Sequence, residues 1–177
     1  MKIRKATLAD IPQITAIYDR ILTEEECGRA TIGWVRGIYP TEQTALDALN
    51  AGTLFVLERK GAVAAAAKID QNQVPEYDSA PWAAPEAPPS QVMVLHTLVV
   101  DPQQAGKGCG TEFVRFYEEY ALDRGCPFLR MDTNARNTAA RRLYARLGYR
   151  EVGTVPCVFN GIPDVQLVCL EKTLKIL

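Results

Sequence analysis

The sequence predicts an α/β protein built on one mixed sheet with helices on both faces, and three observations support this. Strand-like and helix-like apolar patterns alternate in the order β-α-α-β-β-β-α-β-α-β-β. Residues 91–100, QVMVLHTLVV, form the nearly continuous apolar run of a strand buried on both faces. With 177 residues, 47% of them hydrophobic, residues 1–177 are predicted to form a single domain.

The first 52 residues predict a strand and two helices. Residues 2–6 resemble a short strand, and either Thr7 or Asp10 can cap the helix that follows. Its apolar positions recur at helical spacing: Ile14, Ile17, Tyr18, Ile21 and Leu22. After an irregular stretch at 24–40, Thr41 opens a second helical pattern. The apolar residues of that helix are Ala45, Leu46 and Leu49, and Gly52 ends it.

Two strands and a long loop are predicted next. Residues 53–59 and 62–69 favour strands joined by a tight turn at Lys60-Gly61, although the alanine run in the second one also fits a helix. Residues 70–90 contain five of the chain's 11 prolines and show no periodicity. A loop of this length inside a domain is usually functional or disordered, so no structure is predicted for it.

The second half of the chain alternates helices and strands and ends in a hairpin. A helix follows the glycines at 106, 108 and 110, with the apolar stripe Phe113, Phe116, Tyr117, Tyr120 and Ala121, and stops at Gly125. A strand at 128–132 precedes a helix between the N-cap Asn137 and Gly148, whose inner face is Ala140, Leu143, Tyr144 and Leu147. Two final strands flank Asn160-Gly161, a pair favoured in hairpin turns.

Charge and hydropathy point away from nucleic acids and membranes. The formal net charge is −1 without a long charge run, which argues against a nucleic-acid footprint or a polybasic membrane surface. No apolar run reaches the roughly 18 residues of a membrane span, and the N-terminus has no signal-like apolar segment. We therefore expect a cytoplasmic protein with a small-molecule partner.

The five cysteines suggest reduced thiols. Their number is odd, and their spacing matches no CxxC or histidine-rich metal motif. We expect mostly buried thiols and assign no metal site.

The turn between residues 100 and 111 has the features of an anion site. A strand that leads through glycines into a helix N-terminus exposes unpaired N–H groups and adds the positive end of the helix dipole. The P-loop pattern fails because Asp101 stands where its first glycine belongs, and the dinucleotide pattern GxGxxG fails on spacing. A plain glycine-rich cap remains the alternative for the turn taken alone.

A second motif adds to the first. LVVDPQQAGKGCGTEF, followed about 30 residues later by NARNTAARRLYARLGY, resembles the GNAT superfamily of acyl-CoA-dependent N-acetyltransferases. The likeness is strong over residues 94–150 and elsewhere rests on element order. It implies a central, mixed but mostly antiparallel sheet of about seven strands with about four helices. In this sequence Ala105 occupies the position that is usually arginine or glutamine, and Lys107 can supply some of the missing charge.

The resemblance also implies how acetyl-CoA binds as a co-substrate, without a metal. Pantetheine would contact the strand before the turn, its pyrophosphate would lie on the N–H groups of the turn, and the motif asparagine would touch the coenzyme. The implied contacts are Leu98, Val99, Val100, Ala105, Gly106, Lys107, Gly108, Cys109, Gly110, Thr111, Asn137 and Tyr144. A strand N–H near Leu98 or Val99 would stabilise the oxyanion. Asn137 is also explained as a helix cap.

Two residues are catalytic candidates. Tyr144 matches the tyrosine that donates a proton to the departing thiolate in many family members, and it is alternatively a core tyrosine. His96 suits a base near neutral pH and shares strand parity with Leu98 and Val100 if no bulge intervenes. Glu26 or a water relay is an alternative base, and a core histidine is the structural alternative.

The acceptor is predicted to be a primary amine of a small molecule or peptide. The acceptor pocket is expected to be formed by the stretch 24–39, the 70–90 loop with Tyr77 and Trp82, and the C-terminal hairpin. The same hairpin could also form a homodimer interface. A non-catalytic acyl-CoA sensor is the rival function. An O-acyltransferase, or a user of longer acyl chains, is a third alternative because a fold does not fix a function.

Overall fold

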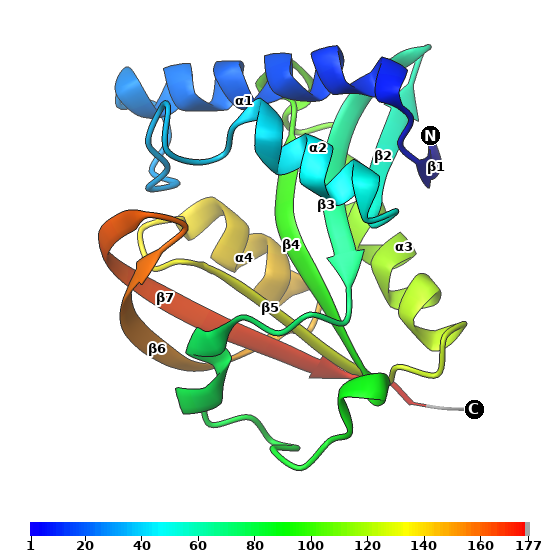
Figure 1. The fold of residues 1–177 in the computed structure, drawn as a ribbon, viewed down its shortest axis with the longest axis vertical. Helices are drawn as coiled ribbons and strands as arrows, with labels where there is room; N and C mark the ends of the chain where they lie inside the picture. The colour runs from blue at the N-terminus through cyan, green and yellow to red at the C-terminus, as the bar shows by residue number, and fades with distance from the viewer. Residues whose placement is uncertain (176–177) are drawn as a thin grey trace.

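A computed structural model describes residues 1–175, and Figure 1 shows a sheet between two layers of helices. The strands are β1 (Lys2–Lys5), β2 (Leu54–Arg59), β3 (Ala62–Asp70), β4 (Val92–Val100), β5 (Phe128–Asn134), β6 (Arg150–Phe159) and β7 (Ile162–Thr173). The helices are α1 (Ile11–Glu26), α2 (Glu42–Asn50), α3 (Cys109–Leu122) and α4 (Thr138–Arg146). These elements confirm the predicted fold class, and the alanine run is a strand.

The sheet is mixed, with one parallel pair at its centre. Its seven strands lie in the order β1-β2-β3-β4-β5-β7-β6. All neighbours are antiparallel except β4 and β5. The crossover from β4 to β5 runs through α3, as parallel pairing requires. The carboxyl ends of β4 and β5 therefore point the same way, and the functional motifs follow them.

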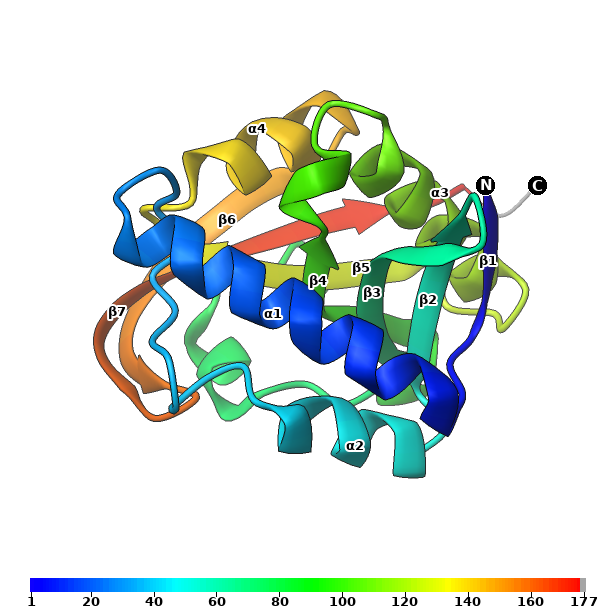
Figure 2. The ribbon, with the colours of Figure 1, turned by 90° about the horizontal axis from the view of Figure 1, so that it is seen from above.

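Different elements cover the two faces of the sheet (Figure 2). One apolar cluster joins α3 and α4 to the sheet through Phe113, Tyr117 and Tyr144. A second cluster, on the opposite face, packs Ile14 and Ile17 of α1 against the strands together with α2. Each helix buries the apolar stripe that its sequence period predicts.

The 70–90 loop packs on the same face of the sheet as α1 and α2. It contains two short 3-10 turns, at Pro75–Ser79 and Pro89–Gln91. Tyr77 and Trp82 are buried, with ring centroids 5.0 Å apart, and the Trp82 indole N–H donates to the Tyr77 carbonyl at 2.8 Å. The Arg130 guanidinium lies 4.5 Å from the Trp82 ring centroid and donates to the Ala84 carbonyl. The loop is thus an ordered wall of the domain.

The cysteines remain unpaired, as expected. All five are free, and Cys109, Cys126 and Cys169 are buried. In residues 1–175 no helix is long and apolar enough to cross a bilayer.

Candidate active site

Strands β4 and β5 separate halfway along their length. They pair from Val92↔Phe128 to Leu95↔Met131 and no further. In the paired half, the Tyr117 hydroxyl of α3 donates to the carbonyls of Met93 and Arg130 and so ties the two strands together. Beyond Leu95 the backbone groups of the two strands face an opening, which we call the fork.

A bulge in β4 marks the start of the fork. Thr97 has a φ of +52°, unusual for a β-branched residue, and the register against β3 shifts between Ala66 and Lys68. The Tyr39 hydroxyl hydrogen-bonds the Thr97 hydroxyl and holds this backbone from the α1–α2 loop. The extra residue reverses the alternation of side chains that follows it.

Because of the bulge, His96 does not share a face of the sheet with Leu98 and Val100, and the prediction from strand alternation is wrong on this point. Leu98 and Val100 pack on the cluster beneath α3 and α4. His96 faces the opposite side of the sheet, where its Nε2–H donates to Asp70 Oδ1 at 3.0 Å. The sequence could not predict this orientation of His96, because a threonine is a common strand residue and gives no local signal for a bulge at positive φ.

The turn after β4 leads from the strand through the glycines into α3, as predicted. Asp101 is buried, pairs with Arg20 of α1 at 2.8 Å and accepts from the Gln103 N–H, which fixes the start of the turn. Gly106 and Gly108 have φ of +73° and +80°, and a Cβ on either would meet nothing within 4 Å. These two glycines therefore serve backbone conformation and leave open space in front of the turn.

Gly110 has a different purpose. A Cβ there would lie 3.1 Å from Leu143 Cδ2 of α4 and 3.6 Å from Val100 Cγ2. The missing side chain lets the start of α3 approach α4 and β4 closely. Packing thus accounts for the third glycine of the motif.

The turn presents free donors to solvent. Its internal backbone hydrogen bonds use the N–H groups of Ala105, Lys107 and Glu112. Within the described residues, the other N–H groups of this segment have no backbone acceptor: Gly106, Gly108, Cys109, Gly110 and Thr111. Lys107 folds back, and its Nζ donates to the Gln103 carbonyl at 2.9 Å. An anion on this surface would meet both the donors and the positive end of α3.

Helix α4 places the second motif beside the fork. The Asn137 side chain caps the helix by accepting from the Ala140 N–H at 3.1 Å, which confirms its structural role. Tyr144 is buried, and burial, with a smaller effect from Asp132, raises the pKa of its phenol. Its hydroxyl has no hydrogen-bond partner among residues 1–175, and the residue lines the cavity described below.

On the α1–α2 side of the fork, His96 belongs to a charged cluster. Asp70 accepts from His96 and pairs with Lys68 Nζ at 3.1 Å. Burial favours the neutral acid, but the hydrogen bond and charge of His96, with Asn72 and Lys68, outweigh it and lower the pKa of Asp70 to about 2. The carboxylate fixes the imidazole tautomer and leaves Nδ1 as the free acceptor of the neutral ring. By contrast, Glu26 lies outside the cavity and pairs with Arg36 at 2.8 Å.

Asp132 is a functional candidate that the sequence analysis missed. It lies on β5 one residue beyond the last pair with β4, and it accepts a 2.7 Å hydrogen bond from the Tyr77 hydroxyl. Burial raises its pKa to about 6, and Tyr77 and His96 offset only part of that rise. The sequence did contain a signal for Asp132. It is a carboxylate at the end of the predicted strand 128–132, the next strand after the one that leads into the glycine turn.

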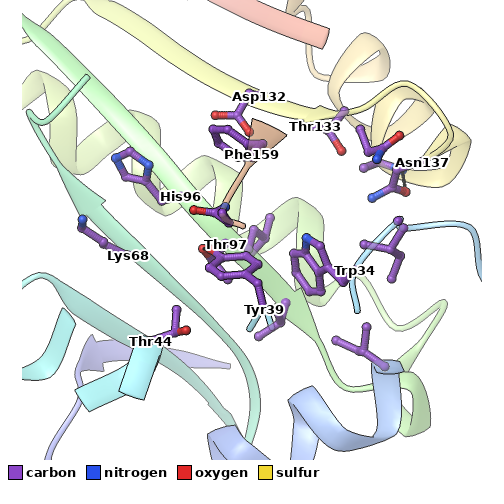
Figure 3. Close-up of a pocket in the computed structure, with 18 of the residues that line it drawn as sticks. Trp34, Tyr39, Thr44, Lys68, His96, Thr97, Asp132, Thr133, Asn137 and Phe159 are labelled. Atoms are coloured by element: carbon purple, nitrogen blue, oxygen red, sulfur yellow. Dashed lines mark hydrogen bonds between the residues drawn. The ribbon is translucent and has the colours of Figure 1, made fainter. Parts of the chain in front are cut away.

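One cavity of about 1040 Å³ connects these groups across the fork. Tyr144, Asn137 and Leu98 reach it from the side of α3 and α4, and Ala105 marks its end at the turn. Figure 3 shows the other side, where His96 and Asp132 lie among Trp34, Tyr39 and Phe159. Trp82 is buried away from the cavity, whereas Tyr77 acts on it through Asp132.

Asp132 is expected to destabilise the protein near neutral pH. The raised pKa means that the unfolded chain loses a proton at about pH 4 that the folded protein keeps to about pH 6, so stability falls as pH rises through this window. Removing the charge with Asp132→Asn should stabilise the fold by about 1–3 kcal/mol at pH 7.

Urea unfolding at several pH values checks this prediction. The difference between Asp132→Asn and wild type should grow from pH 4 to 6 and then stay constant. The groups that interact electrostatically with Asp132 come from several elements: Tyr39, Glu76, Tyr77, His96, Tyr144, Cys157 and Cys169. A variant less stable than wild type at pH 7 would contradict the burial argument.

Comparison with known proteins identifies the family. A model of the acetyltransferase (GNAT) family matches residues 16–149. The L-methionine sulfoximine/L-methionine sulfone acetyltransferase of Pseudomonas paraeruginosa is 28% identical over 158 residues, 88% of this chain and 84% of that protein. An uncharacterized N-acetyltransferase of Methanocaldococcus jannaschii is 34% identical over 61 residues, 34% of this chain. These matches span only 27% of that archaeal protein and 49% of a second one.

Solved structures share the fold. A GNAT-family acetyltransferase of Streptococcus agalactiae superposes with a TM-score of 0.82 at 21% identity, covering 99% of this chain and 96% of that one. An acetyltransferase structure from Salmonella typhimurium, solved with acetyl-CoA, gives a TM-score of 0.69 at 21% identity over 99% and 95% of the two chains. The family model covers most of the chain, so this protein belongs to the GNAT acetyltransferase family.

Proposed function

We propose that this protein transfers acetyl from acetyl-CoA to a primary amine by direct attack in a ternary complex. The observation that carries the proposal is a cavity that joins the fork to Tyr144 and ends at Ala105, next to the turn with its free N–H donors. A thioester in the fork would be accessible to an amine from the α1–α2 side and to a proton donor from the α4 side.

The residues present fit acetyl-CoA. Its pyrophosphate matches the N–H groups of this turn that lack a backbone acceptor in the described chain, and the space in front of Gly106 and Gly108 is open. The open edge of β4 at Leu98, Val99 and Val100 offers backbone partners to the pantetheine amides. The lack of an arginine or glutamine side chain at Ala105 is compatible with this fit, because the turn would bind its anion through backbone donors.

Different side chains of the protein would carry out the two proton transfers of the reaction. When bound, acetyl-CoA supplies the activated acetyl group. A backbone N–H near Leu98 or Val99 stabilises the negative charge on the carbonyl oxygen. The Tyr144 phenol, kept protonated by burial, donates to the departing sulfur. His96, held by Asp70, accepts the amine's proton directly or through water.

The relative that this chain matches over most of its length favours a small-molecule acceptor over a peptide. The Pseudomonas relative, which this chain matches over most of its length, is described as acting on L-methionine sulfoximine and L-methionine sulfone, both small primary amines. The acceptor side of the cavity is walled by Trp34, Tyr39 and Phe159. We therefore place the acceptor there.

Release of free CoA tests the proposal. Purified protein with acetyl-CoA should release CoA when a suitable primary amine is added, and mass spectrometry should find the amine heavier by one acetyl group. Binding of acetyl-CoA without amine-dependent release over a broad amine panel would favour the alternative, an acyl-CoA sensor on the same fold.

A further inference from the structure

The acceptor half of the cavity has an unusual balance of charge. Two cationic side chains, Arg29 and Lys68, and four carboxylates, Glu24, Asp47, Asp70 and Asp132, are part of its wall. Both cations already have partners, because Arg29 pairs with Glu24 at 2.8 Å and Lys68 with Asp70 at 3.1 Å. Within residues 1–175, the cavity wall therefore offers an incoming ligand no cation that lacks a carboxylate partner.

The carboxylates are not balanced in the same way. Asp132 has a neutral hydrogen-bond partner, the Tyr77 hydroxyl, which occupies only Oδ2. Asp47, the other carboxylate without a cation, is exposed at the end of α2 and accepts from Gln43. Asp132 thus offers a partly buried negative charge next to the fork, where an attacking amine has to arrive.

The remaining wall combines neutral polar side chains, among them Thr44, Thr97 and Thr133, with an apolar and aromatic patch. Trp34 and Tyr39 meet edge to face with centroids 5.8 Å apart, and an apolar cluster of the β6–β7 hairpin joins them through Phe159 and Ile162. Aromatic faces attract ammonium groups and pack well against hydrocarbon. They provide no compensation for a ligand carboxylate.

We propose that the acceptor is a primary amine with an apolar or aromatic body and without a carboxylate, whose ammonium group is recognised by Asp132. This inference rests on the proposed function and specifies its substrate class. An α-amino acid would bring its carboxylate beside Asp132 and Asp70 with no unpaired cation to receive it, a repulsion that makes the cavity selective. The specificity would thus differ from that named for the Pseudomonas relative.

Matched amines test the inference on the intact protein with acetyl-CoA. The probes are 2-phenylethylamine, L-phenylalanine and L-phenylalaninamide, where the amide keeps the branching of the amino acid but removes its charge. A second pair, 3-(methylsulfonyl)propan-1-amine and L-methionine sulfone, repeats the comparison on an aliphatic body. We expect kcat/KM for each amine to exceed that of its amino acid by about 10- to 100-fold, with the amide close to the amine. Equal or better use of the amino acids would overturn the inference.

Variants assign the selectivity to Asp132. In Asp132→Asn the ratio between 2-phenylethylamine and L-phenylalanine should fall about tenfold. In Asp47→Asn, an exposed carboxylate on the same cavity, the ratio should stay within about twofold. A structural defect would lower both rates without moving their ratio. An unchanged ratio in Asp132→Asn would refute the role of Asp132.

Binding separates failure of the inference from failure of the proposed function. Calorimetric titration of 2-phenylethylamine into protein saturated with CoA should give heat that is absent with L-phenylalanine. If acetyl-CoA binds but neither 2-phenylethylamine nor 3-(methylsulfonyl)propan-1-amine binds, the substrate class is wrong and the coenzyme site stands. If acetyl-CoA itself does not bind, the proposed function fails.

Discussion

Replacing Gly108 with aspartate is expected to weaken acetyl-CoA binding by about 10- to 100-fold, whereas asparagine at the same position should leave it within about twofold. Gly108 has a φ of +80° at the start of α3, and a Cβ there points into open space. Asparagine and aspartate both tolerate such a φ and have the same shape. The difference in acetyl-CoA affinity between the two variants therefore measures the effect of a negative charge at the turn, separately from the effect of the side chain's shape.

The stability of the ligand-free variants provides the control. A carboxylate at the N-terminus of α3 interacts favourably with the helix dipole, so Gly108→Asp should be at least as stable as Gly108→Asn. Gly125→Asp, at the other end of α3, has a φ of +70° and open space and should bind acetyl-CoA like wild type. Isothermal titration calorimetry measures all three affinities. Equal affinities of the two Gly108 variants for acetyl-CoA would show that the pyrophosphate does not bind at this turn.

The second large effect is expected at Tyr144. Tyr144→Phe should lower kcat by about 100-fold or more, because the phenol is the proton donor that we assign to the departing sulfur. Affinity for acetyl-CoA should change little, since the ring and its packing remain. The measurement is CoA release with the best amine of the panel, combined with calorimetric binding of acetyl-CoA.

Tyr149→Phe is the matched control for this variant. The Tyr149 ring lies 6.0 Å from that of Tyr144, and its hydroxyl is buried without a hydrogen-bond partner among the described residues. Tyr149 does not line the cavity, so its variant should keep full kcat and lose no stability. If Tyr144→Phe also keeps full kcat, the donor is another group or water.

The glycine turn and the element order could be predicted because their signals are local. Hydrophobic period, caps and turn residues located the seven strands and four helices of residues 1–175, and the turn was predicted from the glycines that precede a helix. Even there, packing against Leu143 at Gly110 depends on α4, which no local pattern reports.

The acceptor side could not be predicted for the opposite reason. The bulge at Thr97 turns His96 away from Leu98, and it depends on Tyr39 from a loop 58 residues earlier in the chain. Asp132 acquires its environment from Tyr77, 55 residues away in a loop without periodicity. Both effects are tertiary contacts that override local expectations, and both concern residues that we place at the site.

Thermal unfolding with and without acetyl-CoA tests the central claim, that the fork and the turn bind this co-substrate, most directly. A ligand that binds only the folded protein stabilises it by about 2.7 kcal/mol at a concentration of 100 times its Kd. For a domain of this size we expect the midpoint to rise by about 5–10 °C. An unchanged midpoint at about 1 mM acetyl-CoA, in protein that unfolds cooperatively, would contradict the account.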